Sequence, residues 1–327
     1  MAVDRVALRT YSMLGEQGAF FNRLAELASQ DDNFAVLAAD LAQSSGLGKF
    51  MRDCPEQFYN IGIAEQNMLG IAAGLAKTGF RVFAATFANF ITMRSCEQVR
   101  VNLGYMRLPV KLVGTRAGII NGPLGNSHFC FEDIALMRAI PNIVIVSPAD
   151  AFEAVKTAEA AAESDKPMYI RLTGKMNTPL VYKADYDFQI GKAVILKEGT
   201  DVVIFTAGTI AANGLKAAKA LEDEGISTAV VNMHTIKPLD TEMLERYAGA
   251  KLWVSLEEHN VVGGLGSAIA EYKATLRNAP PQIFLGLPDA YGKAGAYEWM
   301  MEENGLSVKG ICERIGREMR ILEQKNG

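Results

Sequence analysis

The chain has 327 residues, of which 49% are hydrophobic and 21% are charged, and its formal net charge at pH 7 is −4. This length exceeds one ordinary hydrophobic core and predicts two domains, while the slightly acidic balance and the lack of a basic run exclude an electrostatic nucleic-acid surface. The four scattered cysteines form no disulfide or zinc pattern and fit a reducing cytosol, and no apolar run reaches the roughly 20 residues needed to span a bilayer.

The first half of the chain alternates predicted helices and strands. A helix is expected over 14–29, and the apolar run from Phe34 to Leu41 is typical of a buried parallel strand. A short strand from Tyr59 to Ile63 then leads into a helix that ends at Lys77. The elements predicted after it are strands over 81–86, 110–115, 143–147 and 167–172, and helices over 91–103, 132–138 and 151–163.

The stretch 178–187 is polar and charged, and we place a domain boundary within it, between residues 183 and 184. The alternation then restarts, with strands over 201–206, 228–233, 251–256 and 282–287 and helices over 211–224, 241–248 and 267–277. Such alternation implies parallel sheets covered by helices on both faces. The sequence therefore predicts an α/β protein of two doubly wound domains with mainly parallel sheets, residues 1–183 and 184–327.

Glu65 stands at the head of the predicted helix that ends at Lys77. Gly70 and Gly74 lie four residues apart in this helix, beside three alanines. Interior glycine destabilises a helix by about 0.5–1 kcal/mol relative to alanine, so the bare face predicts a close approach by another group. A carboxylate at the head of such an apolar helix is poorly solvated, and desolvation favours its protonated form. The alternative is an ordinary acid in a first helical turn, stabilised by the helix dipole.

Two other segments carry candidate functional side chains. Phe87 and Phe90 flank a turn after a strand, where an aromatic face could stack on a flat heterocycle, although taken alone they are more often core residues. The glycine-rich loop 116–128 is longer than about 12 residues, and such loops are usually functional. His128 at its end could bond a sugar hydroxyl or move a proton, or could cap the next helix as a satisfied core group.

Ligands of parallel sheets bind outside the carboxyl ends of the strands. The candidate side chains that stand at or just beyond those predicted ends are Asp40, Ser44, Glu65, Phe87, Phe90, Arg116, His128 and Arg171. No metal-ligand cluster, nucleophile elbow or Walker loop accompanies them, so the sequence predicts no metal site within this chain.

Four motifs, in chain order, carry a resemblance to a known family: GIAEQNMLGIAAGLA, TFANF, SHFCFEDIALMRAIPNIVIVSPAD and EEHNVVGGLGSAIAE. Together they resemble the C-terminal half of transketolase and, more closely, the second subunit of bacterial split transketolases. The resemblance implies a pyrimidine-binding domain for thiamine diphosphate followed by a transketolase C-terminal domain. The same architecture occurs in deoxyxylulose-phosphate synthase and in the beta subunits of 2-oxoacid dehydrogenases.

The resemblance implies a role for each candidate. Glu65 matches the carboxylate that hydrogen-bonds the aminopyrimidine ring, Phe87 and Phe90 match the aromatic clamp on that ring, and Asp40 matches an acid near the thiazolium. The cofactor would carry the carbanion chemistry, while the protein would supply orientation and a dry pocket. The residues implied to contact the substrate, with His128 also catalytic, are Ser44, Arg116, His128 and Arg171.

Two positions depart from the family pattern. Arg116 replaces a phosphate-binding histidine, and Leu124 stands where the family has an aspartate that reads the acceptor's α-hydroxyl. Leu124 cannot accept a hydrogen bond, and losing a buried polar reader relaxes discrimination by about 1–3 kcal/mol. We therefore expect transfer of a two-carbon ketol unit between an aldose and an anionic ketose that differs from ordinary pentose phosphates in configuration, branching or terminal group.

The chain lacks a Gly-Asp-Gly element followed by an asparagine, with which the family holds Mg²⁺ (or Ca²⁺) and the diphosphate. The resemblance thus implies a separate N-terminal-half subunit that holds the metal, homodimerisation of this chain, and a cytoplasmic heterotetramer without nucleic-acid or membrane partners. The alternatives are a deoxyxylulose-phosphate-synthase-like enzyme, a 2-oxoacid dehydrogenase beta subunit, against which Arg171 and the segment 257–260 count, and a catalytically silent paralogue.

Overall fold

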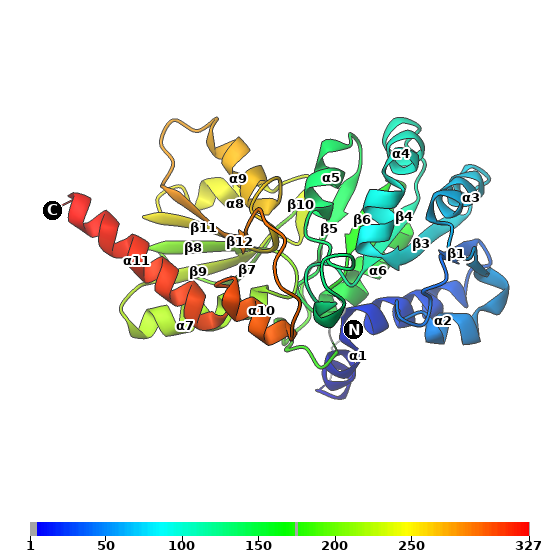
Figure 1. The fold of residues 1–327 in the computed structure, drawn as a ribbon, viewed down its shortest axis with the longest axis horizontal. Helices are drawn as coiled ribbons and strands as arrows, with labels where there is room; N and C mark the ends of the chain where they lie inside the picture. Colours follow the sequence, from blue (N-terminus) through cyan, green and yellow to red (C-terminus); the bar gives the residue numbers. More distant parts are fainter. Residues whose placement is uncertain (1–4, 174–175, 327) are drawn as a thin grey trace.

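The computed structural model describes residues 5–173 and 176–326 and contains two α/β domains side by side, each with helices on both faces of a mainly parallel sheet (Figure 1). This architecture confirms the predicted fold class. Within the described residues, no helix is both long enough and apolar enough to cross a membrane.

The first sheet has seven strands in the order β10-β5-β6-β4-β3-β1-β2. All neighbouring pairs are parallel except β10 with β5. The strands are β1 (Phe34–Ala38), β2 (Phe58–Asn60), β3 (Arg81–Phe87), β4 (Lys111–Thr115), β5 (Val144–Val146), β6 (Met168–Arg171) and β10 (Thr235–Lys237). The helices that accompany this sheet are α1 (Arg5–Ala28), α2 (Gly48–Asp53), α3 (Glu65–Lys77), α4 (Cys96–Gln98), α5 (Asp133–Ala139) and α6 (Ala151–Glu163).

The pleat of β1 explains how the two faces of this sheet are covered. Val36 and Ala38 join one hydrophobic cluster with residues of α1 and α6. Ala35 and Leu37, which point the opposite way, join another cluster with residues of α3 and α5. A strand buried on both faces has a continuous apolar sequence, as the run from Phe34 predicted.

The second sheet has the order β12-β11-β8-β9-β7, and only β7 is antiparallel to its neighbour. Its strands are β7 (Val194–Lys197), β8 (Val202–Thr206), β9 (Thr228–Asn232), β11 (Leu252–Asn260) and β12 (Gln282–Leu287). Its helices are α7 (Ala211–Asp223), α8 (Thr241–Arg246), α9 (Leu265–Lys273), α10 (Tyr297–Glu303) and α11 (Val308–Asn326).

Several elements were not predicted from the sequence: α2, β7, β10, α10 and α11. Ile311, Ile315 and Met319 are buried on one side of α11, and their spacing of four could have indicated this helix. The strand β10 is too short for a periodic pattern. The predicted helix over 91–103 is instead two π-helical turns, Phe90–Arg94 and Val99–Tyr105, on either side of α4.

The two domains share packing and pairing. The second-half strand β10 completes the first sheet by pairing with β5, and one hydrophobic cluster contains residues of both sheets, among them Leu112 and Phe205. The boundary between residues 183 and 184 stays a prediction, and the two halves share strand pairing and a hydrophobic cluster.

Asp150 and Glu153 at the start of α6 hold the connecting segment. Asp150 caps the helix by accepting from the Glu153 N–H at 2.8 Å, and its other oxygen accepts from the backbone N–H groups of Val181 (2.7 Å) and Tyr182 (3.0 Å). Burial raises the pKa of the Asp150 carboxyl to about 6. This aspartate therefore fixes both the helix terminus and the chain that leads into the second domain.

Glu153 joins three parts of the chain. Its carboxylate accepts from the hydroxyls of Tyr182 (2.9 Å) and Tyr186 (2.7 Å), from Nδ2 of Asn232 (2.8 Å) and from the Ala149 N–H (2.6 Å). The side chain is fully buried. Because these donors come from the first domain, the connecting segment and β9, Glu153 fastens the two domains together.

We expect Glu153→Ala to lower the free energy of unfolding by about 3–5 kcal/mol, since it leaves several buried donors without their acceptor. Glu163→Ala is the matched control, because Glu163 lies on the same helix with an exposed side chain, and it should change stability by less than about 0.5 kcal/mol. Urea unfolding of the full chain measures both. Equal losses in the two variants would contradict the assignment.

Candidate active site

The carboxyl ends of β1, β3 and β4 are neighbours and gather most of the predicted site residues. In the strand register Ala38 pairs with Ala85 and Phe87 pairs with Thr115, so the residues that follow β1 and β4 flank the end of β3. Asp40, two residues beyond β1, is exposed at this edge and has a positive φ of 62°. The sheet order therefore brings Asp40 to the edge where Phe87 lies, as predicted.

Arg116 directly follows β4 and links Ser44 to the aromatic residues. Its Nε donates to the carbonyl oxygen of Ser44 at 3.3 Å, and its guanidinium lies 5.6 Å from the centre of the Phe87 ring. Arg116 is half-buried and Ser44 is exposed. These two predicted substrate residues thus lie together and retain access to solvent.

Phe87, Phe90 and His128 form an aromatic group. The rings of Phe87 and Phe90 are stacked with centroids 5.9 Å apart, and the His128 ring meets Phe90 edge-on, also at 5.9 Å. Asn89 Nδ2 donates to the Ser127 carbonyl at 3.0 Å, which ties the phenylalanine turn to the histidine loop. The His128 Nδ1 hydrogen-bonds the Ser127 hydroxyl at 2.9 Å, and its ring does not cap α5.

Glu65, the first residue of α3, is 3% exposed and has a cationic partner that the sequence analysis missed. Nη1 of Arg94 donates to Glu65 Oε1 at 2.6 Å, and the Arg94 guanidinium lies over the Phe90 ring, 4.3 Å from its centre. Arg94 follows Phe90 by four residues on one helical turn, and such residues share a face. The spacing of four could have indicated the contact between Arg94 and Phe90.

The bare face of α3 is open in this chain. Nothing lies within 4 Å of the position that a Cβ would occupy at Gly70 or Gly74. The close approach predicted there is therefore not made within the chain itself, because this face points outward. The apolar side chains of Ile63, which is 79% exposed, and Ile71 lie on the same segment.

Arg171 ends β6 but does not face the site. Its Nε donates to Asp133 Oδ2 at 2.8 Å and its Nη2 donates to the carbonyl oxygen of Glu258 at 2.9 Å. The side chain is 2% exposed, and Asp133 is fully buried. Withdrawing the guanidinium would leave a buried carboxylate without its cation. The prediction that Arg171 binds the substrate is therefore wrong, and its role here is to join the two domains.

The loop that carries His128 is held from the second domain by Glu258, a residue of β11. Glu258 Oε1 accepts from the Ile119 N–H at 2.8 Å, and Oε2 accepts from the Tyr297 hydroxyl at 2.6 Å. A Cβ at Gly118 would lie 2.1 Å from Glu258 Oε1, and Gly118 has a φ of +75°. Only glycine fits there, so the carboxylate is built into the course of the loop.

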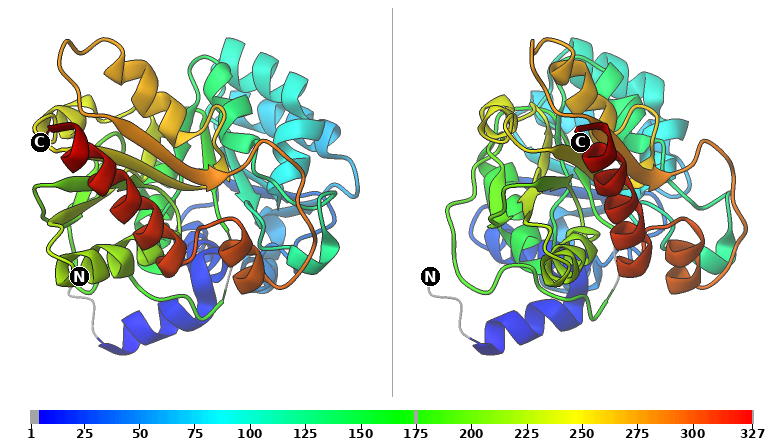
Figure 2. Two further views of the ribbon diagram at one scale, coloured as in Figure 1. Left: turned by 60° about the vertical axis from the view of Figure 1, so that its left-hand side comes forward. Right: turned by 90° about the vertical axis from the view of Figure 1, so that its left-hand side faces the viewer.

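A second segment of the C-terminal domain also holds the loop that carries His128. The segment 288–296, orange in Figure 2, runs from the end of β12 across to the first domain before α10. In it Gly292 O accepts from Asn126 Nδ2 at 2.9 Å, and the Gly295 N–H donates to Gly122 O at 3.3 Å. The loop also contributes Ile119 to the hydrophobic core of the second domain.

Two ionisable side chains beside Glu258 have pKa values shifted by burial. Burial raises the pKa of Glu257 to about 7, although the N–H groups of Leu265 and Gly266 at the start of α9 donate to it. Burial lowers the pKa of His259 to about 4. His259 is therefore neutral at pH 7, and its Nε2 accepts from the Ala135 N–H of α5 at 3.4 Å.

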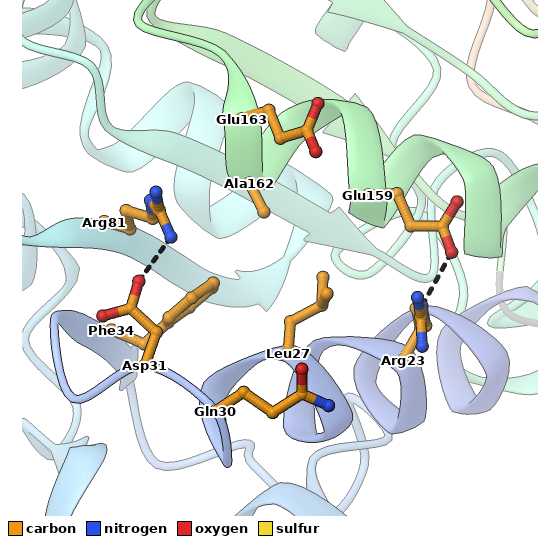
Figure 3. Close-up of a pocket in the computed structure, with 9 residues that line it drawn as sticks. All are labelled: Arg23, Leu27, Gln30, Asp31, Phe34, Arg81, Glu159, Ala162 and Glu163. Carbon is orange, nitrogen blue, oxygen red and sulfur yellow. Dashed lines mark hydrogen bonds and ion pairs between the residues drawn. The ribbon is translucent and has the colours of Figure 1, made fainter.

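Another hollow, of about 450 Å³, lies between α1, α6 and the amino ends of β1 and β3 (Figure 3). An ion pair between Arg23 and Glu159 (2.8 Å) and another between Arg81 and Asp31 border it. Exposed ion pairs of this kind contribute little to stability. The hollow lies at the amino ends of the strands, on the opposite edge of the sheet from the candidate site. We assign no chemistry to it.

The arrangement at the carboxyl edge suits a planar heterocycle. A buried carboxylate and the face of Phe90 already hold a flat, hydrogen-bonding group, the guanidinium of Arg94, so the residues present fit a ring with the same needs. Leu124, at the rim of the loop, is 56% exposed. Among the described residues, no three His, Cys, Asp or Glu side chains lie close enough to hold a metal ion.

The chain matches two domain families and several known proteins. Residues 16–179 match the transketolase pyrimidine-binding domain and residues 191–311 match the transketolase C-terminal domain. The chain is 36% identical over 305 residues to a subunit of the apulose-4-phosphate transketolase of Phocaeicola vulgatus, covering 92% of this chain and 96% of the relative.

Two further matches agree. The chain is 37% identical over 311 residues to the 6-deoxy-6-sulfo-D-fructose transketolase subunit SqwH of a Clostridium species, covering 94% of each. A solved structure described as a split gene transketolase, inactive beta4 tetramer, superposes with a TM-score of 0.83 at 39% identity, covering 93% of this chain and 97% of that one.

We expect Glu258→Ala to speed amide exchange at Ile119 by about 10- to 100-fold, because the N–H loses its carboxyl acceptor, and hydrogen bonds to carboxylates are worth roughly 1.5–3 kcal/mol. Glu258→Gln keeps an acceptor oxygen and should restore most of the protection. Tyr297→Phe removes the other hydrogen bond of the same carboxyl group but leaves the Ile119 N–H its acceptor, so exchange at Ile119 should change less than in Glu258→Ala. Hydrogen exchange measured by mass spectrometry on the full chain reports all three, and unchanged exchange in Glu258→Ala would contradict this anchoring.

Proposed function

Because the chain belongs to the transketolase family and spans its pyrimidine-binding and C-terminal domains, we propose that it is the C-terminal subunit of a split, thiamine diphosphate-dependent transketolase. The enzyme transfers a two-carbon ketol unit from an anionic ketose to an aldose. The observation that supports this most is the buried carboxylate of Glu65, which the Arg94 guanidinium links to the face of Phe90 at the carboxyl edge of the sheet.

Each residue of this edge has a task in the proposal. Thiamine diphosphate, when bound, supplies the carbanion chemistry. Glu65 would share a proton with the aminopyrimidine ring, and its burial keeps competing water away from the carboxyl group. Phe90 would offer a stacking face, Phe87 packs against it, and Asp40 is proposed to act near the thiazolium.

His128 and Arg116 are proposed to handle the sugar. The imidazole of His128 lies edge-on to Phe90, where it can bond a sugar hydroxyl or move a proton. Arg116, next to Ser44, is half-buried and carries the positive charge that suits an anionic terminal group. Because Arg171 is turned away from the site, Arg116 is the candidate arginine that stays a substrate residue.

The substrate is proposed to differ from ordinary pentose phosphates. Leu124 carries no hydrogen-bond acceptor at the position where the family reads a hydroxyl, and its side chain is exposed at the loop rim. Two relatives are named for apulose 4-phosphate and for 6-deoxy-6-sulfo-D-fructose. These names support a sugar with an unusual skeleton or terminal group.

The proposed assembly includes a partner with the other half of the cofactor site. That N-terminal-half subunit would hold the diphosphate and Mg²⁺ (or Ca²⁺). The open glycine face of α3, with Ile63 and Ile71 exposed beside it, supports contact with a further polypeptide, including a second copy of this chain in a heterotetramer. Four free cysteines fit a cytoplasmic location.

The burial of Arg171 bears on the alternative function, a 2-oxoacid dehydrogenase beta subunit, because Arg171 no longer counts against it. A phosphate-gripping arginine at this position would count against a 2-oxoacid dehydrogenase beta subunit, but Arg171 is paired with Asp133 instead. The names of the relatives in the split transketolase group now favour ketol transfer.

We expect Glu65→Gln, in the complex assembled with the N-terminal-half subunit, to lower kcat by about 100-fold or more, since a neutral amide cannot share the proton. Glu56→Gln changes an exposed glutamate on the 3₁₀ turn Pro55–Gln57, which precedes β2. This control should leave kcat unaltered. Steady-state ketol transfer measures both. Full turnover by Glu65→Gln would show that this carboxylate takes no part in activation.

We expect a panel of donor ketoses to show weak use of xylulose 5-phosphate with ribose 5-phosphate and better use of branched or sulfonated sugars. Leu124→Asp should raise kcat/KM for the hydroxyl-bearing pentose phosphate acceptor by about 5- to 150-fold, because it supplies the missing acceptor at roughly 1–3 kcal/mol. The wild-type complex preferring the pentose phosphate pair would sink this assignment of substrate.

A further inference from the structure

Arg94 uses the two features of the site that an aminopyrimidine ring would need. Its Nη1 donates to Glu65 Oε1 at 2.6 Å, and its guanidinium lies 4.3 Å from the centre of the Phe90 ring. A guanidinium is flat, stacks on aromatic faces and presents donors in its own plane. In shape and in stacking it therefore resembles an aminopyrimidine, and its N–H donor takes the place that a protonated ring nitrogen would take beside the same carboxylate.

The two groups cannot both occupy this place. The same carboxylate oxygen and the same ring face would have to serve Arg94 and the cofactor ring at once. Phe87 packs on Phe90 at 5.9 Å and His128 meets its edge, so the aromatic group has little free surface to offer a second flat partner. Binding of one partner therefore excludes the other.

We propose that Arg94 is a placeholder for the aminopyrimidine ring of the cofactor, which must displace it from Glu65 and Phe90 on binding. This inference rests on the proposed function, since it takes the ring to be that of thiamine diphosphate. It adds Arg94, which was not among the predicted site residues, as a residue that sets the affinity of this chain for the cofactor.

The fold gives a reason for such a residue. Glu65 is 3% exposed, and a carboxylate buried without a cation or donors is strongly destabilising. In the proposed assembly, this chain also exists without the other half of the site and without the cofactor. Arg94 neutralises the carboxylate during that time.

The geometry also allows Arg94 to leave. Its side chain is 47% exposed, so the guanidinium can move into solvent without crossing the core. Its backbone has a separate contact, because Gln66 Nε2 donates to the Arg94 carbonyl at 3.0 Å. Displacement is thus a side-chain rotation, and the π-helical turn that carries Phe90 need not change.

The test measures thiamine diphosphate affinity by isothermal calorimetry, with Mg²⁺ present, for the chain assembled with its N-terminal-half subunit. Arg94→Met removes the competing group, and we expect binding to tighten by about 10- to 100-fold, as when a site competent only 1–10% of the time becomes fully available. Arg94→Lys keeps the charge but not the flat fork, and should give an intermediate affinity. This second variant also covers the case in which Arg94→Met does not fold.

Arg100→Met is the matched control. Arg100 lies six residues further along, exposed, with its guanidinium on Glu97 at 2.8 Å, and the substitution should leave the affinity unchanged. A parallel thermal-shift series should show a lower melting temperature for the cofactor-free Arg94→Met complex but a larger upward shift on adding thiamine diphosphate.

The outcomes separate this inference from the proposed function. Unchanged or weaker cofactor binding by Arg94→Met, in a complex whose wild type is active and whose Glu65→Gln variant is not, overturns the placeholder alone. A wild-type complex that neither binds thiamine diphosphate nor transfers ketol units overturns the proposed function. Tighter binding by Arg94→Met with an unaltered Arg100→Met supports the inference.

Discussion

The pairing of a buried carboxylate with a flat cation is the interaction on which the candidate site depends. Glu65 is almost out of contact with water at the head of α3, and the Arg94 guanidinium satisfies it while lying on Phe90. A charge placed there without a partner would be too costly to keep. The same two features that accommodate this cation are those that we propose for a planar cofactor, and in that proposal Arg94 and the cofactor compete for one location.

The second domain gives the first domain's loop its shape. Glu258 accepts from the Ile119 N–H and fills the space beside Gly118, while the segment 288–296 holds the far side of the same loop. His128 is the last residue of that loop. A histidine on a long glycine-rich segment would otherwise sample many positions, and the C-terminal domain restricts them. These contacts and the hydrogen bonds of Glu153 fix the position of the second domain against the first. The geometry of the site therefore depends on how the two domains pack.

Arg171 and Arg94 show why the sequence could not predict which arginine faces the candidate site. Both are arginines near strand or helix ends, and the sequence alone favoured Arg171. In the fold Arg171 points inward to Asp133, whereas Arg94 faces Glu65 and Phe90. Which way a long side chain points depends on partners distant in sequence, here 38 residues away for Asp133 and 29 for Glu65.

The sequence by itself determined the α/β class, the order of most strands and helices, and the gathering of Asp40, Phe87 and Arg116 at one edge. These follow from local periodicity and from the rule that parallel strands end together. Only the tertiary structure decided that β10 joins the first sheet, that Glu258 supports the His128 loop and that Arg94 covers Glu65. Such contacts join residues far apart in the chain, and their geometry exists only once the packed layers bring them together.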